Sequence, residues 1–332
     1  MPSKYSNVSD VPLALAVFLA SDTYAHNSDP NTISATTLLK PIRQIILGLR
    51  IKPGETLINL SDMMALRMGT AIHDGIERAW IKNYPAAMEA LGFPKKVIDR
   101  IVINPTEKPD QLAPDAIPIY LEQRLTRKLG EWTVTGQYDF ISEGKVQDFK
   151  STGVWAFKKQ SNTSKYIEQG SIYRWLDPEL ITANTMEIHY IFTDWKAMMT
   201  RSDPTYPARR FQTQSLELMP IGETNRFIKD KLDAIDKYLD VAEKDIPLCN
   251  DLDLWRSAPQ FKYYKNGNIN SSRSTKNFTT NNDAVLYMAT KGGNVGAIKE
   301  VPGTVTACKY CPAFAICTQK DALIESGDLL MG

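Results

Sequence analysis

The chain has 332 residues, of which 43% are hydrophobic and 23% are charged, and its formal net charge is +1. This length and composition are those of a globular protein with a sizeable core, either one elaborated domain or a core with an appended lobe. The nearly balanced charge argues against extended, nonspecific coating of nucleic acid, although it leaves room for one locally basic channel.

An apolar run at Val11–Ala20 follows Asp10 and carries Pro12 in its first turn, which predicts the start of a helix. Lys4 is the only basic residue before the run, so the segment does not match a signal peptide. The run is also too short to span a membrane. We therefore expect a buried or docking N-terminal helix, no membrane contact and a cytoplasmic protein.

The periodicity of apolar residues next predicts helices over 62–83, 86–101 and 221–243. Strands are predicted over 117–127, 131–141, 144–151 and 186–193, with turn-forming residues between them. Strands that are preceded and followed by helices predict an α/β fold, in which helices cover both faces of a mixed sheet.

Charged residues gather on the hairpin predicted for the second and third strands. Gly136-Gln-Tyr-Asp139 ends the first of these strands, and Asp148-Phe-Lys150 lies on the next. Side chains alternate along a strand, so Asp148 and Lys150 share one face and Phe149 points the other way, into a core. Two carboxylates beside an ammonium suit a divalent metal that activates water for phosphodiester cleavage. A solvated strand face is the alternative interpretation.

Two predicted helical segments each carry a pair of polar residues on one face. His73 and Glu77 are four residues apart, as are Gln169 and Tyr173, so each pair lies on one helix face. Gly69, one turn before His73, permits the close approach of another backbone. Each segment alone is also compatible with an ordinary amphipathic helix.

Four motifs thus follow one another in a set order, namely Gly69-x3-His73-x3-Glu77, Gly136-x2-Asp139, Asp148-x-Lys150 and Gln169-x3-Tyr173. In this order they resemble the RecB-type branch of the PD-(D/E)xK nuclease superfamily, over roughly residues 34–320. The resemblance implies a restriction-endonuclease-like core with a mixed central sheet flanked by helices. It also implies a metal site whose ligands are His73, Asp139, Asp148 and the backbone carbonyl of Phe149.

The resemblance implies further roles around this site. Lys150 would orient the attacking water or stabilise the pentavalent phosphate, and Glu77 would support the metal site or Lys150. Gln169 and Tyr173 would line a DNA channel near the scissile phosphate. Oxygen ligands with one imidazole suit Mg²⁺ or Mn²⁺, as one ion or as two. The catalytic residues implied are therefore Glu77, Asp139, Asp148 and Lys150.

The cysteines indicate a second metal site. All four lie in the last third of the chain, at Cys249, Cys308, Cys311 and Cys317. Four thiolates match either a tetrahedral Zn²⁺ or an iron–sulfur cluster. Two disulfides or unrelated buried thiols are the alternatives, but nothing in the sequence indicates an oxidising compartment.

The C-x2-C-x5-C spacing at Cys308 resembles the tail that binds a [4Fe–4S] cluster in AddB-type and CRISPR-adaptation nucleases of the same superfamily. In those relatives the remaining cysteine lies before the nuclease motifs, whereas here no cysteine precedes His73 and Cys249 is the candidate fourth ligand. The resemblance implies a [4Fe–4S] clamp, with zinc as the alternative, that ties the segment after the core to the C-terminus.

A basic segment lies between these cysteines. From Phe261 to Asn282 it has no acidic residue, and Asn266-Gly267 within it is a hairpin signal. We expect a hairpin at the edge of the DNA channel, with phosphate contacts from Lys262, Lys265, Arg273 and Lys276.

The sequence thus predicts a helical N-terminal elaboration over 1–60, a nuclease core over 61–200, a helical extension over 201–245 and the four-cysteine segment over 246–332. The predicted function is that of an Mg/Mn-dependent deoxyribonuclease, an exonuclease that hydrolyses linear DNA, duplex or single-stranded, in recombination, repair or genome processing. No G-x4-G-K-[ST] loop is present, which indicates a stand-alone nuclease rather than the arm of a helicase.

By analogy this is a phage exonuclease acting in the host cytoplasm, and a single-strand annealing or binding protein is a candidate partner. Two alternatives stay open. One is a catalytically inactive DNA-binding module held by a zinc or iron–sulfur knot, against which the intact Asp139, Asp148 and Lys150 argue. The other is a CRISPR-adaptation-like nuclease, against which the missing upstream cysteine argues.

Overall fold

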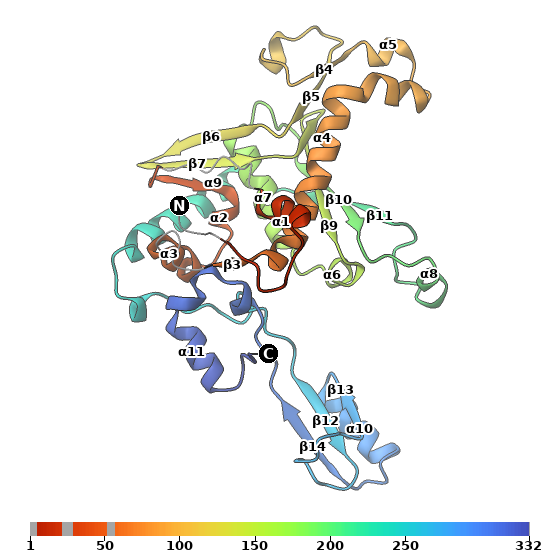
Figure 1. The fold of residues 1–332 in the computed structure, drawn as a ribbon, viewed down its shortest axis with the longest axis vertical. Helices are drawn as coiled ribbons and strands as arrows, with labels where there is room; N and C mark the ends of the chain where they lie inside the picture. Colours follow the sequence, from red (N-terminus) through yellow and green to blue (C-terminus); the bar gives the residue numbers. More distant parts are fainter. Residues whose placement is uncertain (1–4, 22–28, 52–56, 332) are drawn as a thin grey trace. The chain divides into compact units, whose positions relative to one another are not determined.

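The computed structural model describes residues 5–21, 29–51 and 57–331 (Figure 1). The chain divides into two compact units, of which the first comprises 1–40 and 53–233 and the second comprises 41–52 and 234–332. Helix α3 (Ile42–Arg50) therefore belongs with the C-terminal part of the chain although it lies near the N-terminus in sequence. The protein has a mixed α/β fold with several sheets, and this confirms the predicted α/β class.

A six-stranded sheet in the first unit carries the strands predicted to hold the charged residues. Its order is β11-β10-β9-β8-β5-β4. The β9–β10 and β4–β5 pairs are parallel and the other three pairs are antiparallel, so the sheet is mixed as predicted. The strands are β4 (Ile101–Ile103), β5 (Ile117–Leu121), β8 (Phe140–Ser142), β9 (Lys145–Thr152), β10 (Thr185–Phe192) and β11 (Phe211–Glu217).

The strand predicted over 131–141 is two strands in different sheets. β7 (Trp132–Gln137) pairs with β6 (Arg124–Leu129) and β2 (Thr32–Ser34) in a three-stranded sheet. After fully buried Tyr138 the chain enters β8, which forms the hairpin with β9. Glu143 and Gly144 make its turn, both in the left-handed region at φ 50° and 68°. Asp139 therefore lies at the break between two sheets, not at the end of a hairpin strand.

Helix α4 (Met64–Ala90) replaces the two helices predicted over 62–83 and 86–101, and Pro85 lies inside it. A proline within a helix costs a backbone hydrogen bond, about 3 kcal/mol. Tertiary packing offsets this cost, because Trp80, Tyr84 and Met88 from successive turns all pack on one apolar core. The core itself consists of Ile101, Ile119, Leu121 and Phe140.

The remaining first-unit helices include α7 (Thr163–Leu176), which is buried from Gln169 to its end, and α6 (Val154–Lys159). α1 (Leu13–Ala20) is the predicted N-terminal helix, with Leu19 fully buried and Leu13 exposed. The shorter elements are β1 (Tyr5–Ser6), α2 (Ala35–Leu38), β3 (Ile58–Asn59), α5 (Lys95–Ile98) and α8 (Met199–Ser202). No helix among the described residues is long and apolar enough to cross a membrane.

The second unit contains α3, a second three-stranded sheet and two helices, and α9 (Ile221–Tyr238) runs from the first unit into it. The predicted helix over 221–243 is thus confirmed except for its last residues. The second-unit sheet has the order β13-β12-β14. Its strands and helices are β12 (Gln260–Tyr264), β13 (Lys276–Phe278), α10 (Asn281–Thr290), β14 (Ala297–Val301) and α11 (Thr318–Glu325).

Gly136 on β7 allows α7 to approach the sheet. A Cβ atom at Gly136 would lie 2.8 Å from Cε1 of Tyr173 and 3.0 Å from Cδ1 of Leu176. We expect Gly136→Ala to lower the free energy of unfolding by about 1–3 kcal/mol, because two well-packed side chains must shift. Gly75→Ala is the matched control, since helical Gly75 has no atom within 4 Å of such a Cβ. It should stabilise the protein by about 0.5–1 kcal/mol. Urea unfolding measures the free energy of unfolding of the two variants. Equal changes in Gly136→Ala and Gly75→Ala would contradict the packing argument.

Candidate metal and catalytic site

Three potential metal ligands meet in the first unit. His73 lies in the middle of α4, Glu122 directly follows β5, and Asp139 precedes β8. Nδ1 of His73 lies 3.4 Å from Oδ2 of Asp139 and 3.6 Å from Oε1 of Glu122. One ligand atom from each residue lies within 4.8 Å of those of the other two. An imidazole and two carboxylates form a set that can hold a divalent cation.

Glu122 is the member of this set that sequence reasoning missed. Its backbone has φ 49°, in the left-handed region, and its N–H donates to the carbonyl oxygen of Asp139 at 3.2 Å. Its Oε2 accepts a hydrogen bond of 2.9 Å from Gln137. A non-glycine residue held in this backbone region often marks a functional position. In the sequence, the only available signal is a charged residue that directly follows the apolar strand Ile117–Leu121.

The backbone of Phe149 holds two of the ligands in place. Its N–H donates to Oδ2 of Asp139 at 2.9 Å, and its carbonyl oxygen lies 2.9 Å from Nε2 of His73. Its ring packs against the apolar core and makes an edge contact with Phe140 at 6.4 Å. The prediction that Phe149 points into a core is therefore confirmed. The predicted ligand role of its carbonyl stays a prediction, although this oxygen lies beside the imidazole.

Asp148 and Lys150 share a strand face, as their spacing predicted. Nζ of Lys150 lies 2.6 Å from Oδ2 of Asp148, whose side chain is 2% exposed. Burial raises the pKa of Asp148 to about 6, against the opposing attraction of Lys150. Burial lowers the pKa of Lys150, but the attraction of Asp148 and Asp139 outweighs it and the net pKa is raised. Lys150 is therefore a charged ammonium held beside a buried carboxylate.

His73 is protonated at neutral pH in this arrangement. The nearby carboxylates of Asp139 and then of Glu122 raise its pKa to about 10. An imidazolium cannot bind a metal, so metal binding must displace this proton. We expect the affinity for Mn²⁺ to rise with pH, by up to about tenfold per pH unit between about pH 7 and pH 9, and to fall as the pH is lowered.

Titration calorimetry at several pH values, in buffers of different ionisation enthalpy, measures this proton release. His189→Asn is the matched control, because His189 lies on β10 and its pKa is lowered by burial. This variant should keep the pH dependence, whereas His73→Asn should lose it. Mn²⁺ affinity that does not change with pH in the wild type would contradict the ligand role of His73.

The other predicted residues lie close by but differ in exposure. Glu77, one turn after His73, is half-buried, and its pKa is raised by burial and then by Glu122 and Asp74. Nε2 of Gln169 donates to the hydroxyl of Tyr173 at 2.6 Å, and both side chains are buried. Burial of this pair favours a packing role beneath Gly136, and the DNA-lining role stays a prediction.

The four cysteines lie in the second unit, and the structure does not arrange them as a cluster. Among the described residues no thiol belongs to a group of three or more metal-ligating side chains whose ligand atoms lie within 4.8 Å of one another. Cys249 and Cys308 pack against an apolar core, and burial is the main cause that raises the pKa of both thiols, that of Cys249 to about 12. The structure therefore does not support the predicted zinc or iron–sulfur site of Cys249, Cys308, Cys311 and Cys317.

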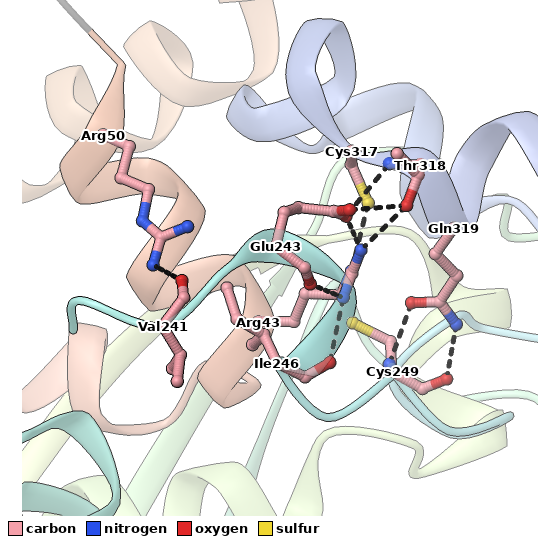
Figure 2. A network of polar contacts seen from close by, with 9 residues as sticks. All are labelled: Arg43, Arg50, Val241, Glu243, Ile246, Cys249, Cys317, Thr318 and Gln319. Atoms are coloured by element: carbon pink, nitrogen blue, oxygen red, sulfur yellow. Dashed lines mark hydrogen bonds and ion pairs between the residues drawn. The ribbon is translucent and has the colours of Figure 1, made fainter. Parts of the chain in front are cut away.

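Polar contacts make the connection that the prediction assigned to a metal clamp (Figure 2). Nε of buried Arg43 donates to Sγ of Cys317 at 3.3 Å. The side-chain amide of Gln319 accepts from the N–H of Cys249 at 2.9 Å and donates to its carbonyl oxygen at 2.8 Å. These contacts join α3 and Cys249 to the start of α11 and the residue before it.

The predicted basic hairpin exists in the second unit, between β12 and β13. Phe261 pairs with Phe278 and Tyr263 with Lys276 in an antiparallel register, and Gly267 lies in the connection at φ 73°. Lys265 and Arg273 also lie in this connection, and Lys262 lies on β12. The phosphate contacts expected of these residues stay predictions.

Comparison with solved structures finds distant similarity. The crystal structure of SSO0001 matches with a TM-score of 0.41 and 16% identity, over 69% of this chain and 86% of that chain. The crystal structure of a phage-related exonuclease from Haemophilus somnus 129PT matches with a TM-score of 0.29 and 15% identity, over 63% of this chain and 93% of that chain. No protein-family model and no curated protein matches the sequence. Similarity this distant assigns no chemistry to the site.

Proposed function

We propose that the protein is a metal-dependent deoxyribonuclease with a PD-(D/E)xK-like core, and that it acts as an exonuclease on linear DNA. The observation that carries this proposal is the convergence of the His73, Glu122 and Asp139 ligands beside Phe149, the residue between Asp148 and Lys150 on β9. Asp139 raises the pKa of both Asp148 and Lys150, so the ligands and the ion pair share one electrostatic environment.

The residues present fit a divalent cation with oxygen and imidazole ligands, such as Mg²⁺ or Mn²⁺. His73, Glu122 and Asp139 would hold it, with Asp148 as a further ligand. When bound, the cation supplies a polarised water and neutralises charge on the phosphate. The proposal does not depend on the four thiols, which are not gathered into a cluster.

Lys150 would stabilise the negative charge that develops on the phosphate. Its ammonium is held in place by Asp148 at 2.6 Å and lies 5.4 Å from the ring centre of Tyr166. A fixed positive charge beside a metal site stabilises the negative charge that develops on a phosphate under attack. The Phe149 backbone positions Asp139 and His73 for the same reaction, because it bonds to both.

Cleavage of end-labelled linear DNA and closed circular DNA in Mg²⁺, Mn²⁺ or EDTA tests this function. We expect metal-dependent loss of label from linear DNA and no cutting of closed circles. Cutting of circles would make the protein an endonuclease. DNA binding without cleavage in either metal would contradict the proposal and favour a catalytically inactive DNA-binding module.

A further inference from the structure

The second unit contains a small module, Gln260–Val301, in which α10 packs on the sheet β13-β12-β14 (Figure 1). The ring centre of Tyr287 on α10 lies 5.6 Å from that of Tyr263 on β12 and 5.2 Å from that of Phe278 on β13. Beside these contacts runs an open groove of about 460 Å³, whose lining includes Lys276, Phe278, Asp283, Tyr287 and Lys291. Its volume is within the range of ligand sites.

The module is strongly basic in a chain that is nearly neutral. It has six basic residues and two acidic ones, hence a net charge of +4, whereas the whole chain carries +1. Lys262 on β12 lies directly opposite Lys299 on β14, on the sheet face away from Tyr263. This lysine pair lies on the face opposite α10 and the groove, so it adds to the charge of the module and not to that of the groove. The module is therefore complementary to a polyanion.

The groove adds aromatic surface to this charge. Nζ of Lys276 lies 4.5 Å from the ring centre of Tyr287 and 5.2 Å from that of Phe278. The Lys276 side chain is exposed, while both rings are half-buried at the edge of the groove. An exposed ammonium that lies over ring faces can move to a phosphate and leave a ring face to a base. Lys291, at the end of α10, provides a second cation on the groove wall.

We propose that this module binds single-stranded DNA, with an unpaired base stacked on the aromatic pair Phe278 and Tyr287 and neighbouring phosphates bound by Lys276 and Lys291. A single strand is favoured over a duplex because base faces are accessible to aromatic side chains only where bases are unpaired. The inference goes beyond the proposed function, because it concerns a binding surface in the second unit and not the cleavage of DNA.

Fluorescence anisotropy of the full-length protein with labelled oligo-dT, in EDTA, tests the proposal. We expect oligo-dT to bind more tightly than a duplex of the same length. Tyr287→Leu should weaken oligo-dT binding by about tenfold, the order of one lost base stack. The double variant Lys276→Gln/Lys291→Gln keeps the aromatic packing, and it should reduce the slope of log K against log salt by about 1.4.

Matched controls come from the same unit outside the module. Lys309→Gln and Tyr310→Leu alter an exposed lysine and a 74% exposed tyrosine, and neither should change oligo-dT affinity. Unchanged affinity and salt slope in both groove variants would overturn the proposal, as would equally tight binding of a labelled polyglutamate peptide. Because EDTA prevents metal-dependent cleavage, a protein without nuclease activity could still satisfy this test, and the two proposals fail separately.

Discussion

Lys150→Ala should reduce metal-dependent cleavage of linear DNA by about 10²- to 10³-fold or more, the loss expected when one preorganised charge is removed from a reacting phosphate. The variant also removes the ammonium that lowers the pKa of Asp148, so this pKa should rise further above about 6. A larger fraction of Asp148 would then be protonated at neutral pH, which weakens it as a metal ligand. Single-turnover cleavage of end-labelled DNA measures the effect.

Lys145→Ala is the matched control for this prediction. Lys145 lies on the same strand and also pairs with a carboxylate, at 3.1 Å from Oε1 of Glu187, but both side chains are about a third exposed. An ion pair of this kind contributes about 0–1 kcal/mol, and its loss should leave cleavage unchanged. DNA binding and circular dichroism of Lys150→Ala should match those of the wild type. Cleavage by Lys150→Ala at the wild-type rate would show that the site is assigned wrongly.

Arg43→Met should lower the stability of the second unit by about 3–5 kcal/mol, because it leaves the carboxylate of Glu243, which is 22% exposed, and two carbonyl oxygens without their cationic partner. Arg43 is 2% exposed and pairs with the Glu243 carboxylate. It also donates to the carbonyl oxygens of Glu243 at 3.2 Å and Ile246 at 3.0 Å, as Figure 2 shows. Faster hydrogen exchange in peptides that cover α11, with little change in α7, would place the loss in the second unit.

Arg50→Ala is the matched control on the same helix. Arg50 donates to the carbonyl oxygens of Tyr238, Leu239 and Val241, at 2.6 Å for Val241. Its removal leaves accepting groups that can turn to water, so we expect a loss of about 1 kcal/mol. Equal losses for Arg43→Met and Arg50→Ala would contradict the argument that the buried charge of Arg43, and not hydrogen bonds alone, holds this region.

The proton-linked metal affinity of His73 and the packing at Gly136 have smaller expected effects. Both depend on contacts between elements that are distant in sequence. The prediction of two helices where α4 runs through Pro85 failed for the same reason, because the packing of Trp80, Tyr84 and Met88 on one core overrides the local cost of proline.

The thiol prediction shows the limit of spacing as evidence. A C-x2-C-x5-C pattern indicates metal binding, yet the structure packs Cys249 and Cys308 on an apolar core and Arg43 against Cys317. Whether thiols meet depends on the path of the chain between Cys249 and Cys308, which the spacing within the pattern does not describe.

By itself the sequence determined the features that depend on local geometry. Asp148 and Lys150 share a face because strand side chains alternate with a period of two. β12 and β13 pair where the basic hairpin is predicted, although residues 265–275 connect them and not a two-residue Asn-Gly turn. The tertiary structure alone decided which distant residues meet. Glu122 joins His73 and Asp139 because the sheet order puts β5 beside β8, next to α4. Arg43 reaches Cys317 across 274 residues. Such meetings are set by strand order and helix packing, which are properties of the whole chain and leave no periodic signal in any one segment.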